Sequence, residues 1–177
     1  MKLTRPARRA FLVAHVTVSA SWLGLTLGLL ALAVTATTTG SAVTAEASVR
    51  VMKLFADWLL LPFAFLTLLS GVPLSLGTQW GLARHRWVWT KFWLSLAATA
   101  ATAFALRPGV NSALAAVAAG GPPPGPRDLL PGPVVSLCAY VFMTAISVLK
   151  PWGLTRRGRN QRAASRTPAR AERAGAR

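Results

Sequence analysis

Acidic residues are scarce in this chain, since only four of its 177 residues are Asp or Glu. That number leaves almost no material for paired-carboxylate catalysis or for proton transport through carboxylates. One cysteine excludes an intramolecular disulfide and a cysteine-bound zinc site. The sequence also lacks a Ser/His/Asp set and a glycine-rich phosphate loop. We therefore expect a protein that is not an enzyme and that holds no metal.

Apolar residues are abundant by contrast, at 53% of the chain against 14% charged residues, with a mean hydropathy of +0.46. They gather in four long stretches, and each is near the roughly 20 residues that a helix needs to cross a bilayer. We predict an all-α polytopic membrane protein, a bundle of four transmembrane helices. The expected parts are a basic arm over 1–9, a membrane domain over 10–152 with spans at about 10–37, 58–76, 88–106 and 129–149, and a disordered basic tail over 153–177.

The positive charges give these spans a direction. Lysine and arginine accumulate in the cytoplasmic loops of membrane proteins. If the N-terminus is inside, 16 of the 20 lysines and arginines are cytoplasmic. We therefore predict a multi-pass plasma-membrane protein with both termini in the cytoplasm. A basic start before an apolar run also occurs in signal peptides, but this run exceeds their 7–15 residues, so we expect the first segment to be retained, with cleavage as the alternative.

Tryptophans mark the expected membrane boundaries, because indole rings favour the headgroup level. Six of the seven lie near the ends of the spans. Trp22 is the exception, deep in the first stretch. It shares a helical face with other polar residues, and this face is predicted to point into the bundle because lipid offers polar atoms no partner. The residues of this face are His15, Ser19, Trp22 and Thr26.

Small residues recur at every fourth position in two stretches and predict faces for close helix packing. They are Ala20, Gly24 and Gly28 in the first stretch and Ala97 and Ala101 in the third.

The second stretch is expected to begin as an amphipathic helix outside the bilayer. Glu46 with Arg50, and Lys53 with Asp57, are spaced for favourable pairs on one helical face. Within the membrane, Pro62 and Pro73 each remove a backbone donor. Gly71 lies close to the second proline, so we predict a kink at 70–73 that shapes the packing of this helix.

The connection between the third and fourth stretches is expected to be irregular. Arg107-Pro108 is predicted to end the third helix, and 120–126 reads as an extended polyproline-like linker. Asp128 suits the start of the fourth helix. The tail after 152 has almost no large apolar residue, so we expect disorder and attraction to anionic lipid headgroups. Nucleic-acid binding is not expected, because no folded or aromatic readout element accompanies the arginines.

The two histidines raise one cofactor hypothesis. His15 is the ionisable residue of the first span, and such residues are functional candidates. His15 and His85 are candidate axial ligands of a haem, although facing helices normally supply such a pair. Copper binding lacks the necessary cluster of Met, His and Cys. The simpler interpretation is that His15 binds a hydroxyl at similar depth, the candidates being Ser95, Thr144 and Ser147. We expect no cofactor, with haem as the alternative.

Three segments carry a family resemblance: Ala14-His15 to Gly24, the run from Ser70 to Thr78, and Trp80-Gly81-Leu82 to Lys91. Over about 10–150 the chain resembles small four-span integral membrane proteins of actinobacteria whose function is unknown. The first histidine with its following Trp-x-Gly is similar, more weakly, to copper-resistance-type membrane proteins. The resemblance implies four spans and supplies no activity.

These observations predict an interaction or structural module, such as a small subunit of a membrane assembly, with a membrane-protein partner or a second copy of itself. The alternative is a membrane protein that binds a small molecule or cofactor near His15 on the cytoplasmic side.

Overall fold

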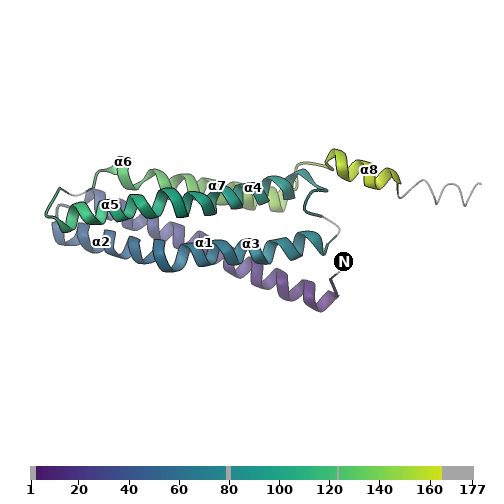
Figure 1. Cartoon of the computed structure of the whole chain (residues 1–177), viewed down its shortest axis with the longest axis horizontal. Coiled ribbons are helices and arrows are strands. Elements are labelled where there is room, and N and C mark those ends of the chain that lie inside the picture. The colour runs from purple at the N-terminus through teal and green to yellow at the C-terminus, as the bar shows by residue number, and fades with distance from the viewer. Residues whose placement is uncertain (1–2, 79–80, 123, 165–177) are drawn as a thin grey trace, which may run out of the picture.

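The computed structural model describes residues 3–78, 81–122 and 124–164, and this part of the chain is helical with no named strand (Figure 1). One isolated bridge pairs His85 with Leu154. The predicted all-α class is confirmed. Trp80 and the arginines of the tail beyond 164 lie outside the described residues.

The first helix, α1, runs from Arg5 to Thr38, with Pro6 in its first turn where a missing N–H is tolerated. Ser41 then starts α2 (Ala42–Leu54), its hydroxyl accepting the N–H of Thr44. The chain continues without a break through η1 (Phe55–Leu60), a π-helical segment, into α3 (Leu61–Leu76). The predicted pairs of Glu46 with Arg50 and of Lys53 with Asp57 are confirmed.

The second long helix is built in the same way. It comprises α4 (Arg86–Ala101), the π-helical η2 (Thr102–Leu106) and α5 (Arg107–Ala118). The prediction that Arg107-Pro108 ends this helix is wrong. Pro108 lies in the first turn of α5, directly after the π-helical turn, and there its missing N–H does not stop the helix. The short α6 (Pro126–Leu129) leads into α7 (Pro131–Leu149), and the Asp128 carboxylate accepts the N–H of Gly125.

The first part of the tail is ordered where the sequence predicts disorder. Helix α8 spans Arg156–Ala164. Thr155 explains its start, because its backbone N–H donates to Arg84 O and its hydroxyl to Ala83 O, while the same hydroxyl accepts the N–H of Gly158. The tail thus begins on the chain before α4, a tertiary contact that its composition does not encode.

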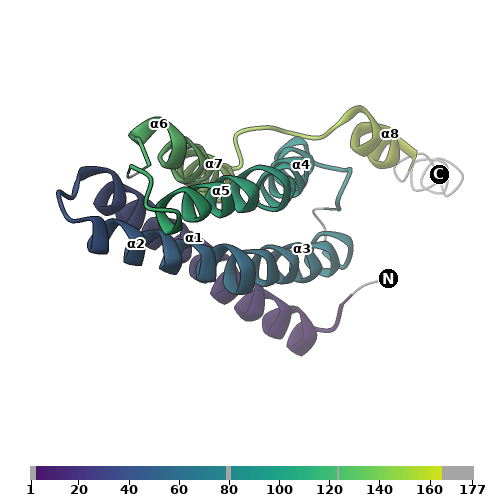
Figure 2. The ribbon, with the colours of Figure 1, turned by 60° about the vertical axis from the view of Figure 1, so that its left-hand side comes forward.

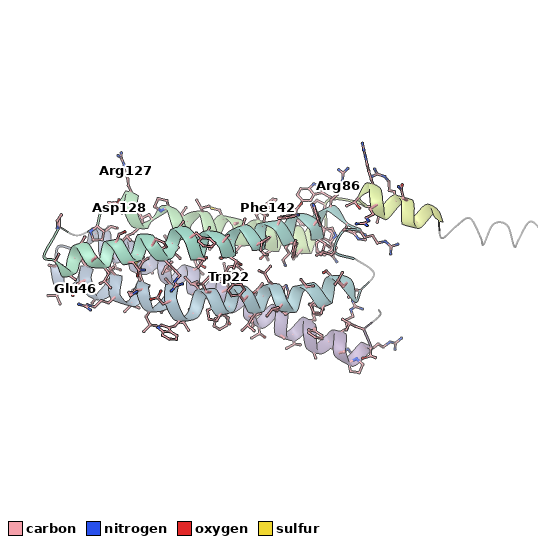
Figure 3. All side chains as sticks on the ribbon, viewed as in Figure 1. Trp22, Glu46, Arg86, Arg127, Asp128 and Phe142 are labelled. Carbon is pink, nitrogen blue, oxygen red and sulfur yellow. The ribbon has the colours of Figure 1, made fainter. Side chains whose placement is uncertain are left out.

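Two ends of the molecule can be defined from the backbone. At the α3–α4 end, the N–H of Leu3 donates to Gly77 O and that of Arg86 to Gly153 O, so the N-terminus, both helix ends and the start of the tail lie together. The α1–α2 end holds the Thr38–Ala42 connection and α6. Figure 3 shows Glu46, Arg127 and Asp128 at the α1–α2 end and Arg86 at the other.

Trp22 lies at the centre of the packing, midway along the molecule (Figure 3). It is only 2% exposed and meets Tyr140 of α7 with ring centroids 4.6 Å apart. Leu29, Met52, Leu60 and other buried residues continue the core toward the α1–α2 end. Helix α1 packs mainly on α2, α3 and α7.

Within the described residues, three helices are long and apolar enough to cross a membrane: α1, the continuous helix Ala42–Leu76 and α7. The helix that carries the expected span 88–106 is not among them. Lys91, its serine and threonines, and the following Arg107 make it less apolar than the other three.

Candidate functional site

A cavity of about 320 Å³ lies at the α3–α4 end, between the N-terminal half of α1, the second half of α3, and α4. Figure 2 shows α1 and α3 on one side of this end and α4 and α7 on the other. Its lining is largely apolar, with a few polar groups, which is typical of small-molecule sites. The polar residues that line it are Arg8, His15, Thr67, Ser75, Thr78, Lys91, Ser95 and Ser147.

His15 enters the cavity from α1 and is half-buried. Its Nδ1 lies 3.0 Å from the Ser70 hydroxyl, which also lies 2.6 Å from Leu66 O and 3.2 Å from Thr67 O. This hydrogen bond joins α1 to α3, and the tautomer of the ring sets which of the two groups donates. The prediction that His15 binds a hydroxyl is confirmed, but the partner is Ser70 and not Ser95, Thr144 or Ser147, because α1 packs closely on α3.

Lys91 reaches the same cavity from α4. Its ammonium group donates to the Ser147 hydroxyl at 3.0 Å, and no carboxylate pairs with it among the described residues. An ammonium has three donors, so one hydrogen bond leaves capacity for a ligand.

Thr67 supplies a buried polar atom without a partner. The residue lines the cavity and is 5% exposed, yet no hydrogen bond to its hydroxyl occurs in the described part of the chain. Other buried threonines of these helices, among them Thr26, Thr99 and Thr102, donate to the carbonyl four residues earlier. A buried polar atom is normally hydrogen-bonded, so the Thr67 hydroxyl is an exception in the wall of the cavity.

The structure does not bring His85 to His15. His85 precedes α4, pairs with Leu154, and is not among the residues that line the cavity. No group of three or more His, Cys, Asp or Glu suited to a metal occurs within the residues described. His85 is thus absent from the described lining that contains His15, and haem binding by this pair stays a hypothesis.

The polar face of α1 divides between the cavity and the core. His15 lines the cavity, whereas Trp22 and Thr26 are buried in the core, nearer the α1–α2 end. Ser19 lies between these two groups, half-buried, with a buried hydroxyl that has no partner among the described residues. The indole N–H of Trp22 is likewise buried and unpartnered there.

The predicted packing residues have different surroundings. A methyl group on Gly71 would lie 3.1 Å from His15 Cε1, and one on Gly28 would lie 3.1 Å from Phe55. Gly24 has no neighbour within 4 Å of such a methyl group. Ala20, Ala97 and Ala101 are exposed. Pro73 lies inside α3, which stays helical to Leu76.

Lys91 and Thr67 are the site residues that sequence reasoning missed. Lys91 counted there only as a cytoplasmic charge, and Thr67 is one hydroxyl in an apolar run. Lys91 could have been identified from the sequence, because it lies inside the expected span 88–106 and a lysine within a span is a functional candidate. Nothing in the sequence distinguishes Thr67 from the other threonines.

Comparison with known proteins adds no assignment, because no known protein family, no curated protein and no solved structure matches the chain. The resemblance to small four-span membrane proteins therefore stays a prediction.

Proposed function

We propose that this chain is a plasma-membrane protein that crosses the bilayer four times and binds a small molecule, without catalysis, in the cavity beside His15. The observation that carries the proposal is a cavity of about 320 Å³, with an unpartnered Thr67 hydroxyl buried to 5% exposure in its wall. Small-molecule sites start at about 300 Å³ and combine apolar walls with a few placed polar groups.

The proposed membrane arrangement places the cavity in the cytoplasmic half. Three helices have the length and hydropathy of spans, and the α4–η2–α5 helix would be the fourth. The four spans form a bundle in this arrangement, and the basic flanks favour an α3–α4 end on the cytoplasmic side. The tail then lies beside the inner leaflet, whose anionic headgroups attract its arginines by about 1 kcal/mol each.

Native mass spectrometry of the full chain, released from membranes in a mild nonionic detergent, tests the binding function. We expect one small molecule to stay bound per chain and to be lost in Ser95→Phe, whose ring would fill the cavity from α4. Ser112→Phe is the matched control, because Ser112 is exposed on α5 far from the cavity. A chain without any bound molecule, or one that keeps it in Ser95→Phe, contradicts the proposal.

An interaction module is the second candidate function, and the exposed small residues favour it. Gly24 on α1 and Ala97 and Ala101 on α4 leave open faces on which a helix of another membrane protein, or of a second copy, can approach closely. Crosslinking of single cysteines placed at these positions in a Cys138→Ser background tests it. Crosslinks absent from all three positions contradict it.

A further inference from the structure

The charged residues that line the cavity are all positive. Lys91 and Arg8 line it, and no Asp or Glu of the described part of the chain is among its lining residues. The described acids are Glu46, Asp57 and Asp128, of which Glu46 and Asp128 lie at the α1–α2 end (Figure 3) and Asp57 is held by Lys53 and Arg107. A lysine in an apolar surrounding is costly unless an anion or other acceptors compensate it. Lys91 has the Ser147 hydroxyl alone among the described residues.

The remaining walls suit an apolar chain. They include Leu68, Val72, Leu82, Val88 and Phe92 from both sides of the cavity. An apolar group entering such a lining gains the same burial that drives core packing. The ligand is therefore expected to be amphiphilic, with a negative head and an apolar body.

Size and opening restrict the ligand further. At roughly 30 Å³ for each water-sized group, a cavity of 320 Å³ holds about ten such groups, which is a head and the beginning of one chain. Leu12 and Val16 of α1 line the cavity and are also 50% and 57% exposed. The cavity thus opens beside apolar residues that face lipid in the proposed arrangement, so the rest of a chain can continue into the bilayer.

We propose that the cavity binds a single-chain anionic amphiphile whose oxyanion lies at Lys91, with Arg8 at the rim, and whose chain leaves past Leu12 and Val16. This inference rests on the proposed binding function and assigns its ligand class. The oxyanion chemistry is shared by carboxylates and phosphate monoesters.

The test compares four probes of equal chain length on the purified full chain, stripped of bound molecules, by native mass spectrometry in a nonionic detergent. The probes are dodecanoate, dodecyl phosphate, dodecanol and dodecylammonium. We expect one anionic probe per chain, bound at least tenfold more tightly than dodecanol, because a hydrogen bond to a charged group in a buried site contributes that much or more. Dodecylammonium should bind most weakly.

Variants at Lys91 test whether the preference for anionic probes depends on the Lys91 ammonium group. Lys91→Met should weaken binding of the anionic probes about tenfold and leave dodecanol unchanged, whereas Lys91→Arg should keep the anion preference. Arg50→Met removes the same charge at the exposed surface of α2 and serves as the matched control. Thermal unfolding in detergent verifies that each variant is folded. If Lys91→Met does not fold, Arg8→Gln at the exposed rim should weaken anion binding two- to fivefold.

Each outcome separates the two levels of the proposal. Tighter binding of dodecanoate indicates a free carboxylic acid, and tighter binding of dodecyl phosphate indicates a lipid-type phosphate; both support the inference. If dodecanol binds as tightly as the anionic probes, or if the preference for anions survives Lys91→Met, the assignment of an anionic ligand is wrong. The cavity is then still a binding site. The proposed function itself is overturned if every probe binds the Ser95→Phe variant as tightly as it binds the unaltered chain. It is also overturned if no probe binds at all.

Discussion

Asp57 holds two of the long helices together through its two carboxylate oxygens. Oδ2 accepts a hydrogen bond from Lys53 Nζ at 2.8 Å, and Oδ1 accepts one at 2.9 Å from Nε of Arg107, the first residue of α5 in the other long helix. Lys53 also donates to Asn111 on α5. Sequence spacing indicates only the local pair with Lys53. The longer-range partner is a consequence of the packing of α2 and η1 beside η2 and α5.

We expect Asp57→Ala to lower the free energy of unfolding by about 1–2 kcal/mol, because it leaves two cations without their shared partner. Glu46→Ala, which removes one exposed local pair with Arg50, should cost about 0.5 kcal/mol or less. Denaturant unfolding in detergent measures both values. A double-mutant cycle with Arg107→Met should give a coupling of about 1 kcal/mol, and additive effects would show that the pair contributes nothing.

At the scale of elements, the two long helices share an unusual construction. Each continues through a π-helical segment, η1 or η2, and these two segments contact one another. A π-turn adds one residue to the helical repeat and so rotates the faces of the helix beyond it. In both helices a proline comes just after the π-segment, Pro62 in α3 and Pro108 in α5, without breaking the helix.

The helix faces at Gly24 and Gly71 differ in how much room they leave for an added methyl group. We predict that Gly24→Ala raises stability by up to about 1 kcal/mol, because alanine favours the helix and nothing lies near the new methyl group. Gly71→Ala should gain less or lose stability, since its methyl group crowds the His15 ring at 3.1 Å. The midpoint of thermal unfolding, followed by circular dichroism, compares the two. Equal shifts at both positions would contradict the assigned faces.

For the whole molecule, the distribution of charge and of indole rings is consistent with a protein inserted in one direction. Trp58 is 77% exposed on η1, about midway along the continuous helix Ala42–Leu76, and Trp89 and Trp93 are exposed near the α3–α4 end. Trp89 and Trp93 also contact each other, with centroids 5.7 Å apart. The exposed indoles near the α3–α4 end are what a bilayer interface favours.

We predict that a fluorescent-protein fusion at the C-terminus is bright and an alkaline phosphatase fusion there is inactive, because both termini are expected in the cytoplasm. A phosphatase fusion after Gly121, in the α5–α6 connection, should be active. An active phosphatase at the C-terminus would invalidate the orientation, and an inactive one after Gly121 would invalidate the fourth span.

By itself, the sequence determined the helical class, three stretches long and apolar enough to span a membrane, and the ion pairs Glu46–Arg50 and Lys53–Asp57, because each depends on the spacing of residues along one helix. It did not determine where helices continue, since the second long helix runs past Pro108 through a π-segment that contacts the π-segment before Pro62. The site depended still more on the tertiary structure. His15 meets Ser70, Lys91 meets Ser147, and Thr67 is left without a partner because α1, α3, α4 and α7 converge at one end, and residues far apart in the chain meet only there.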